Sequence, residues 1–224
     1  LSGECADEVF GGYPWFHRED MLNADTFPWS RNISERTKVL SKELINEIRP
    51  EEYVRRRYVE TLEEVPRLPG EDAVEARRRE MFYLNITWFM ANLLDRKDRM
   101  SMAHGLEVRV PYCDHRLVQY VWNIPWEMKM LRGREKGLLR KALAGVLPED
   151  VLYRKKSPYP KTHNPSYEKA VTKWLLEILN DPSSPLMPLI DVKAVSALAE
   201  SQSDYGKPWF GQLMAKPQLF AYLI

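Results

Sequence analysis

This sequence has little of what marks disulfide-rich, membrane or nucleic-acid-binding proteins. It contains only two cysteines, Cys5 and Cys113, so no disulfide framework is indicated and a reducing cytoplasm is the expected location. It has no apolar run of about 18 residues and no signal-peptide pattern, so we expect neither a membrane-spanning helix nor secretion. The 33 basic and 32 acidic residues leave a net charge of +1, which gives no reason to expect a nucleic-acid or membrane partner.

The composition is that of a folded globular protein. With 224 residues, 44% of them hydrophobic, the chain is long enough to bury a sizeable core. An aromatic share of 11% and only 10 glycines argue against long disordered stretches. The first residue is Leu, and the sequence opens directly on a glycine-containing motif. We therefore expect a piece of a longer polypeptide, with part of its chemistry upstream.

Almost every readable segment has the apolar spacing of a helix, so we predict a mainly α fold without internal repeats. The expected helices cover 31–48, 50–65, 71–104, 115–124, 138–147, 165–179 and 191–198, with a last one in the tail from Pro208. In the long helix, the run 81–94 is predicted to be buried on all sides, with a break near Asn92. Only the residues around Leu1 and 107–110 show weak strand character.

Prolines and capping residues set the expected boundaries. Pro50 and the pair Asn164-Pro165 are typical helix starts, and Asp191 is a typical N-cap. The prolines and glycine of 65–70 predict a connector. The basic, proline-rich stretch 153–165 is predicted to be an ordered loop or an irregular lid.

The opening stretch LSGECADEVFGGY has the strongest chemical signal. Its carboxylates Glu4 and Glu8 are four positions apart and share a face if a helix begins here. A cation would compensate them, and Mg²⁺ favours one or two carboxylates together with phosphate oxygens. Gly3 lets the backbone approach a ligand closely. The alternative is a plain helix start with acids in its first turn, ended by Gly11-Gly12.

The stretch RKDRMSMAHGLEVRVPYCDHRLV, at 96–118, is the second charged motif. We interpret it as a buried turn, whose charges need either an internal salt-bridge network or a ligand. For Asp98 and Arg99 the internal network is the favoured reading. For Glu107 and Arg109 both readings stay open.

The third motif, GREKGLLRKALAGVLP at 133–148, places Lys136 before a predicted helix. The compact charge of a lysine suits phosphoryl oxygens and a leaving pyrophosphate. Taken alone, an exposed lysine at a helix start is the simpler reading. The basic stretch YRKKSPYP that follows either reaches phosphates or is a solvated loop, and the residues leave this open.

Other polar residues are expected to be structural or to lie on the surface. The histidines have no metal-ligand spacing, the cysteines are expected to be plain thiols, and the arginine runs have acidic neighbours typical of solvated helix faces. The histidines are His17, His104, His115 and His163, the cysteines are Cys5 and Cys113, and the arginine runs are 55–57 and 77–79.

The three motifs together resemble the asparagine synthetase family, from residue 1 to about 165. The family's signature Ser-Gly-Glu-x-x-Asp-Glu-x-Phe-Gly-Gly-Tyr matches the opening stretch, although the family has Gly where this chain has Cys5. Its Lys-x-x-Leu-Arg segment matches Lys136 to Arg140. The resemblance implies the helical C-terminal part of an α/β adenine-nucleotide alpha-hydrolase-like (ATP pyrophosphatase) synthetase domain, with 1–224 lying within that one domain.

The resemblance also implies a mechanism. In the family a glutaminase domain with a terminal cysteine releases ammonia from glutamine. The synthetase domain activates aspartate with Mg-ATP, and ammonia displaces AMP from β-aspartyl-AMP to give asparagine. Carried over, Ser2 and Gly3 contact the nucleotide through the backbone, Asp7 holds Mg²⁺, and Lys136 stabilises charge at phosphorus.

On the substrate side, the resemblance implies that Glu4 guides or deprotonates ammonia and that Glu107 and Arg109 support the pocket. The family's Ser-Gly-Gly-x-Asp-Ser pyrophosphate loop and the glutaminase cysteine are absent from these 224 residues. We therefore predict that they make no asparagine by themselves, which aspartate- and ATP-dependent turnover would refute.

Two other functions are also compatible with the sequence. One is a sibling synthetase, such as a β-lactam synthetase, although such enzymes tend to have a different residue at the Glu4 position. The other is a non-catalytic helical interaction module. Homodimerisation is expected only because it is common among soluble enzymes.

Overall fold

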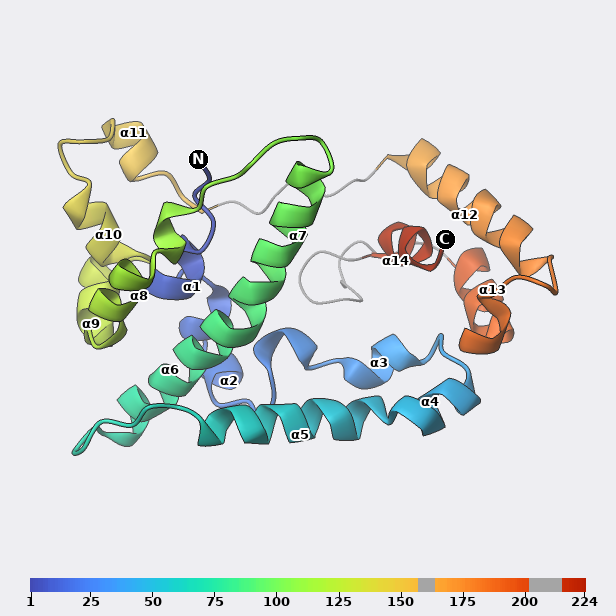
Figure 1. Ribbon diagram of the computed structural model, residues 1–224, viewed down its shortest axis with the longest axis horizontal. Helices are drawn as coiled ribbons and strands as arrows, with labels where there is room; N and C mark the ends of the chain where they lie inside the picture. The colour runs from blue at the N-terminus through green and yellow to red at the C-terminus, as the bar shows by residue number, and fades with distance from the viewer. Residues whose placement is uncertain (157–163, 202–214) are drawn as a thin grey trace. The chain divides into compact units, whose positions relative to one another are not determined.

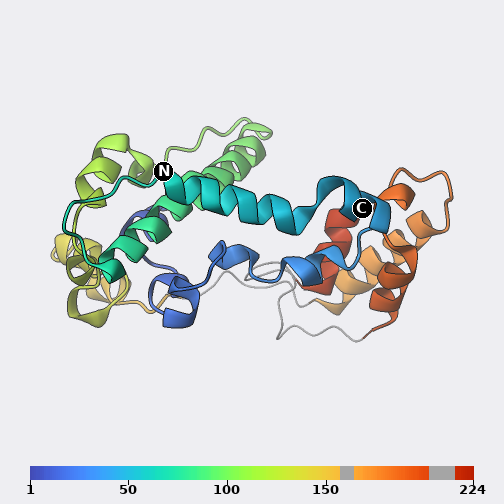
Figure 2. The same ribbon diagram turned by 90° about the horizontal axis from the view of Figure 1, so that it is seen from below.

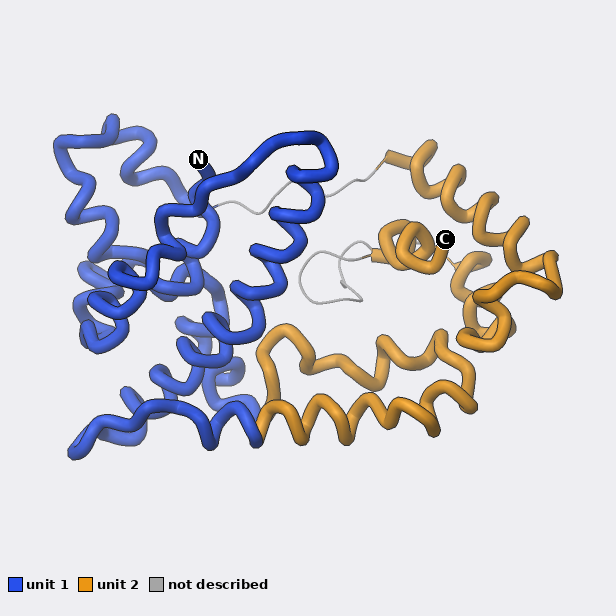
Figure 3. Tube along the Cα trace, viewed as in Figure 1, with its two compact units in different colours: residues 1–25, 60–156 blue, residues 26–59, 157–224 orange. Residues whose placement is uncertain are grey.

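The computed structural model describes residues 1–156, 164–201 and 215–224, and within these ranges it contains helices and turns but no β-strand. Two compact units are formed, unit 1 from 1–25 and 60–156 and unit 2 from 26–59 and 157–224 (Figure 3). The predicted mainly α fold is confirmed. The two weak strand signals are wrong as strands, because the segments share only a backbone hydrogen bond from Ser2 N to Arg109 O, at 2.9 Å, and no ladder.

The helices of unit 1 are α1 (Ala6–Phe10), α2 (Glu19–Leu22), α6 (Ala73–Leu84), α7 (Ala91–Met102), α8 (His115–Trp122), α9 (Trp126–Lys129), α10 (Gly137–Ala142) and α11 (Glu149–Leu152). Those of unit 2 are α3 (Ile33–Thr37), α4 (Lys42–Ile48), α12 (Pro165–Leu179), α13 (Val192–Glu200) and α14 (Lys216–Leu223). The chain passes from unit 2 back to unit 1 within α5 (Pro50–Glu63), between residues 59 and 60. None of the helices described is long and apolar enough to cross a membrane.

A continuous rod formed by α6, a π-helical segment (Asn85–Met90) and α7 is the longest feature of unit 1 (Figures 1 and 2). The predicted long helix is thus confirmed, but its irregularity lies at the π-helical segment and not near Asn92. Asn85 explains the position. It is fully buried, and its side chain donates to Met81 O at 2.7 Å and accepts from Trp15 Nε1 at 3.1 Å. Competition of this kind with the backbone ladder distorts a helix.

Burial of the rod is one-sided, which corrects the prediction that the run 81–94 is buried all round. Met81, Phe82 and Leu84 are buried, but Thr87 and Asn92 are exposed. The π-helical segment contacts the residues that follow α1, where the Phe89 ring meets the rings of Tyr13 and Trp15 edge-on. The rod therefore supports the segment that follows α1.

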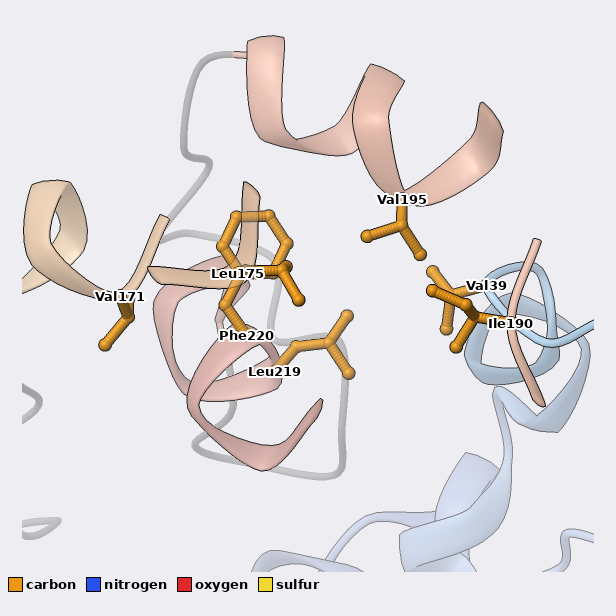
Figure 4. Packing of buried hydrophobic residues seen from close by; sticks show 7 residues of the cluster. All are labelled: Val39, Val171, Leu175, Ile190, Val195, Leu219 and Phe220. Atoms are coloured by element: carbon orange, nitrogen blue, oxygen red, sulfur yellow. The ribbon is translucent and has the colours of Figure 1, made fainter. Parts of the chain in front are cut away.

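The core of unit 2 is built from helices α12, α13 and α14 together with the chain around Val39. Figure 4 shows its buried members: Val39, Val171, Leu175, Ile190, Val195, Leu219 and Phe220. The predicted N-caps are confirmed, since the side chain of Asn164 accepts from Ser166 N at 2.9 Å and that of Asp191 from Ala194 N at 3.0 Å. The tail expected to dock as a helix does so as α14. Its part from Pro208 to 214 lies outside the described residues.

Two expected helices are shorter than predicted. The segment 31–48 divides into α3 and α4, because the Ser41 hydroxyl caps a new helix by accepting from Leu44 N at 3.2 Å and itself donates to Pro188 O at 2.8 Å. The segment 138–147 ends its helix at Ala142, and Glu149–Leu152 then forms a further turn of helix that the sequence did not predict.

Unit 1 also has a cavity of about 330 Å³ that contains an unusual cation. Lys129, at the end of α9, is only 2% exposed. Its Nζ lies 4.0 Å from the centre of the Phe82 ring and 3.5 Å from Trp122 O. Burial, with help from the charge of Arg79, lowers the pKa of Lys129 to about 8.

Candidate functional site

Helix α1 is short and anchored by one apolar face. Val9 and Phe10 pack against Val121 of α8. The helix ends at Gly11, whose φ of 71° is a left-handed conformation that glycine adopts without strain. Beyond it, Gly12 runs so close to α1 that a Cβ there would lie 1.7 Å from Oδ1 of Asp7. The glycine pair therefore ends the helix and also leaves room for the Asp7 carboxylate.

Asp7 lies at the centre of a charge cluster that we call the Asp7 cluster: Asp7, Lys136 and Lys156. Oδ1 of Asp7 is 2.9 Å from Nζ of Lys136 and 3.1 Å from Nζ of Lys156. Burial disfavours ionisation of Asp7, but the two ammonium groups outweigh it and hold its pKa below the usual value. The carboxylate is therefore ionised at neutral pH.

The two lysines reach Asp7 from different elements. Lys136 precedes α10 in a left-handed conformation, with a φ of 55°, after a tight turn. The turn is so tight that a Cβ on Gly137 would lie 2.4 Å from Leu131 O. Lys156 is fixed by two further contacts, since its Nζ donates to Gly12 O at 3.0 Å and lies 4.3 Å from the centre of the Tyr13 ring. The ammonium group of Lys156 is thus held by two groups besides Asp7, whereas Lys136 is placed by the tight turn of its backbone.

Glu8 has a structural environment on the other side of α1. It is 1% exposed, and the Tyr13 hydroxyl donates to its Oε1 at 2.6 Å. Burial is the main reason that the pKa of Glu8 is raised. The shared helical face considered for Glu4 and Glu8 is not formed, because α1 begins only at Ala6 and leaves Glu4 ahead of it.

Glu4 lies beside two cations of α7. Its carboxylate is 3.5 Å from Nη2 of Arg96 and 3.8 Å from Nζ of Lys97. The Ser2 hydroxyl is 3.5 Å away on the same carboxylate. The Glu4 side chain is 15% exposed, so it is largely enclosed between α7 and the residues ahead of α1, 1–5, which we call the signature loop. Beside Gly3, by contrast, a Cβ would meet no atom within 4 Å, so a ligand has room to approach its backbone.

The second motif is solvated, which corrects the expectation of a buried turn. Glu107 and Arg109 pair with each other at 2.9 Å, and their side chains are 64% and 73% exposed. Asp98 is exposed, and Arg99 pairs with Asp95 within α7 on an exposed face instead of tying the helix end to a loop. These side chains extend from the helix and from the extended segment into water. Water solvates their charges, so the charges need no internal salt-bridge network.

The structure brings together Asp7 and Lys136, both predicted site residues, from distant parts of the sequence. Glu4 lies three positions before Asp7, and Ser2 is tied to Arg109 through its backbone amide. Sequence reasoning missed Lys156 as a partner of Asp7. The signal was the basic run 154–156, whose role was left open. The continuation of that run, 157–163, is outside the described residues.

A metal site made only of protein groups is not present in the part of the chain described, which has no cluster of three His, Cys, Asp or Glu side chains. His17 and His104 bond to the carbonyls of Gly11 and Met100 at 2.9 and 3.0 Å, in keeping with a structural role. Asp7 supplies one ionised, partly exposed carboxylate. Such a donor fits an Mg²⁺ whose other ligands are phosphate oxygens and water.

Comparison with known proteins gives matches along the whole chain. The family model described as asparagine synthase matches residues 1–222. Asparagine synthetase [glutamine-hydrolyzing] 3 of Bacillus subtilis (strain 168) is 59% identical over 224 residues, which are 100% of this chain and 36% of that relative. The human asparagine synthetase [glutamine-hydrolyzing] is 35% identical over 93 residues, 40% of this chain and 15% of the relative. The chain thus spans about a third of the length of its B. subtilis relative.

Proposed function

Because this chain belongs to the asparagine synthase family, we propose that it is part of an ATP-dependent amide ligase that converts aspartate to asparagine. The reaction passes through β-aspartyl-AMP and releases pyrophosphate and then AMP. The nitrogen is ammonia released from glutamine by a separate glutaminase domain, a source suggested by the glutamine-hydrolyzing relatives. The observation that carries the proposal is the Asp7 cluster, an ionised carboxylate with two fixed ammonium groups.

The cluster suits the first half of this reaction. A carboxylate is a poor electrophile, and adenylation gives it a good leaving group. Negative charge then builds on the phosphoryl oxygens and on pyrophosphate. Lys136 and Lys156, already fixed within 3.1 Å of one carboxylate oxygen, supply two positive charges where that charge develops. With ATP bound, both lysines would face its triphosphate.

Asp7 is proposed to hold Mg²⁺, which when bound would neutralise phosphate charge as a Lewis acid. The lysines keep the Asp7 carboxylate ionised at neutral pH, which is the form that a metal ion requires. They also offset the negative charge of Asp7 in a site that must accept an anionic nucleotide.

Glu4 is proposed to guide ammonia to the aspartyl-AMP, or to take its proton. Arg96 and Lys97 hold the Glu4 carboxylate beside the signature loop, three residues before Asp7. The open space at Gly3 lets the loop backbone approach the nucleotide. The amide of Ser2 is already bonded to Arg109, so a contact of Ser2 with the nucleotide falls to its remaining polar groups.

The exposed pair Glu107 and Arg109 is proposed to support the aspartate side of the pocket, since the Arg109 carbonyl is bonded to the signature loop. We place the enzyme in the cytoplasm, where ATP, aspartate and glutamine are available, and we expect a homodimer as the commonest assembly of soluble enzymes.

The test is aspartate-dependent release of pyrophosphate from Mg-ATP by the full-length protein that contains this chain. Lys136→Ala is expected to lower the rate about a hundredfold, the scale for losing one charge-stabilising group. Lys141→Ala is the matched control, because Lys141 is an exposed lysine on α10 itself. Release that does not need aspartate, or that falls equally in both variants, would argue against the proposal.

A further inference from the structure

The cavity of unit 1 that contains Lys129 is separate from the Asp7 cluster, since none of Asp7, Lys136 and Lys156 lines it. Its walls come from α6 and the residues just before it, from the end of α8 and from α9. At about 330 Å³ it lies at the small end of ligand pockets, which span roughly 300–1,000 Å³. The cavity is therefore of a size for one small molecule.

Lys129 gives this cavity a positive charge without an ion-pair partner. Its side chain is buried, and no carboxylate lies within 4.0 Å of its Nζ among the residues described. An ammonium group has three donors, and the contact with Trp122 O, at 3.5 Å, uses one of them. A buried cation is costly unless an anion or further acceptors compensate it. The remaining N–H groups of Lys129 are thus available to a ligand.

The acidic residues around the cavity are already engaged with other groups. Glu71 pairs with Arg79 at 2.7 Å, and Glu75 pairs with Arg78 at 2.6 Å. The carboxylate of Asp72 caps α6, where it accepts from two backbone amides at 2.9 and 3.0 Å. The two ion pairs also neutralise both arginines. One positive charge in the cavity is therefore left for a bound anion.

Much of the remaining lining is apolar. The rings of Phe82, Trp122 and Trp126 line the cavity together with Leu68 and Ile124. An inorganic ion would leave these surfaces without a contact, whereas an organic group would cover them. A dianion would need a second cation without a partner, because one ammonium group balances only one negative charge. The lining thus fits a monoanion that has an apolar body.

We propose that this cavity is a binding site for a small organic carboxylate. Its carboxylate oxygens accept from Lys129, and its apolar part lies among the aromatic rings. A charge-assisted hydrogen bond of this kind is roughly twice as strong as a neutral one. Because the Asp7 cluster is not part of the cavity, the occupant is not the aspartate that the proposed reaction adenylates.

Two wall residues connect the cavity to the proposed active site. Trp126 and Phe82 lie against the turn that ends α1, where a Cβ on Gly11 would be 2.5 Å from the Trp126 ring and 3.2 Å from the Phe82 ring. An occupant that shifts these rings would therefore act on the helix that bears Asp7. This consequence rests on the proposed function, but binding itself does not.

The experiment titrates the purified protein containing this chain with fluorobenzoate and with trifluoropropionate, each followed by fluorine NMR at pH 7 and constant ionic strength. The neutral amides of the two acids are the matched ligands, because they keep the shape and lose the charge. We expect saturable binding of at least one acid, with a Kd of roughly 1 mM or tighter. Its amide should bind at least about tenfold more weakly, since it cannot form the charge-assisted bond to Lys129.

Lys129→Met should weaken binding of the acid at least about tenfold and leave binding of the amide unchanged. The control variants are Lys141→Met, at an exposed lysine of α10, and Lys136→Ala, in the Asp7 cluster. Both should bind the acid as the wild type does. Lys129→Met is expected to fold, because it removes a buried charge, and circular dichroism checks this. The comparison of acid with amide needs no variant, so the test does not depend on that outcome.

The inference is overturned if neither acid binds, or if an acid and its amide bind equally well. Binding that persists in folded Lys129→Met overturns it too. Loss of binding in Lys136→Ala would instead place the ligand at the Asp7 cluster, and loss in Lys141→Met would place it on the surface of α10. The readout is binding and not turnover, so a failure of this inference is distinguishable from a failure of the proposed synthetase activity.

Discussion

Lys129 offers a direct test of how burial controls charge in unit 1. It is a cation that is 2% exposed and contacts an aromatic ring and a carbonyl, at 4.0 and 3.5 Å, with no carboxylate within 4.0 Å among the residues described. Its pKa in the folded protein is about 8, compared with 10.5 for an ordinary lysine. Between these two values the unfolded chain holds the proton and the folded one does not. Stability from this residue therefore rises as the pH increases through that window.

The magnitude follows from the two pKa values. At pH 7 the ammonium is charged in both states, and its burial costs about 3 kcal/mol, while at pH 10 the cost falls to about 1 kcal/mol. Methionine has a similar length and no charge, so Lys129→Met removes this pH dependence. The free energy of unfolding of the wild type relative to that of the variant should thus rise by about 2 kcal/mol from pH 7 to pH 10.

The assay is urea unfolding followed by tryptophan fluorescence at both pH values, since Trp122 and Trp126 lie beside Lys129 around the cavity. Subtracting the variant from the wild type at each pH cancels the titration of the other lysines and tyrosines. If the difference between the two proteins is the same at pH 7 and pH 10, to within about 0.5 kcal/mol, Lys129 is not the buried cation described and the reasoning is refuted.

Two further substitutions test the surroundings of α1. Gly12→Ala would place a Cβ 1.7 Å from Asp7 Oδ1, so the carboxylate should move away from its two lysines. Pyrophosphate release should then fall at least tenfold while the circular dichroism spectrum stays unchanged. Normal activity would show that the position of Asp7 does not matter. Tyr13→Phe removes the hydroxyl that donates to the buried Glu8, so the free energy of unfolding in urea should fall by roughly 2 kcal/mol. An unchanged unfolding midpoint would mean that Glu8 finds another hydrogen-bond partner.

Where the structural signal is local, the sequence predicted the helices well. Asn164 and Asp191 each cap a helix through a side chain that accepts from a backbone amide two or three positions along, and Pro50 begins α5. These interactions lie within a few residues of one another, so spacing in the sequence is enough to recognise them.

Where the signal depends on distant residues, prediction failed. The break between α3 and α4 depends on Ser41, whose hydroxyl meets Pro188 O, and the π-helical segment depends on Asn85, whose amide meets Trp15. The solvated state of Glu107 and Arg109 likewise depends on which surfaces the rest of the chain covers. Nothing in the neighbouring sequence specifies such partners.

The mainly α class, most helix starts and the motif residues Glu4, Asp7 and Lys136 could be predicted without a structure, because periodicity, capping and a family signature are properties of short stretches. The meeting of Lys136 and Lys156 at one oxygen of Asp7 could be seen only in the folded protein. Such contacts join segments that are remote along the chain. They are fixed by the packing of whole helices, in which every apolar face must be covered at once.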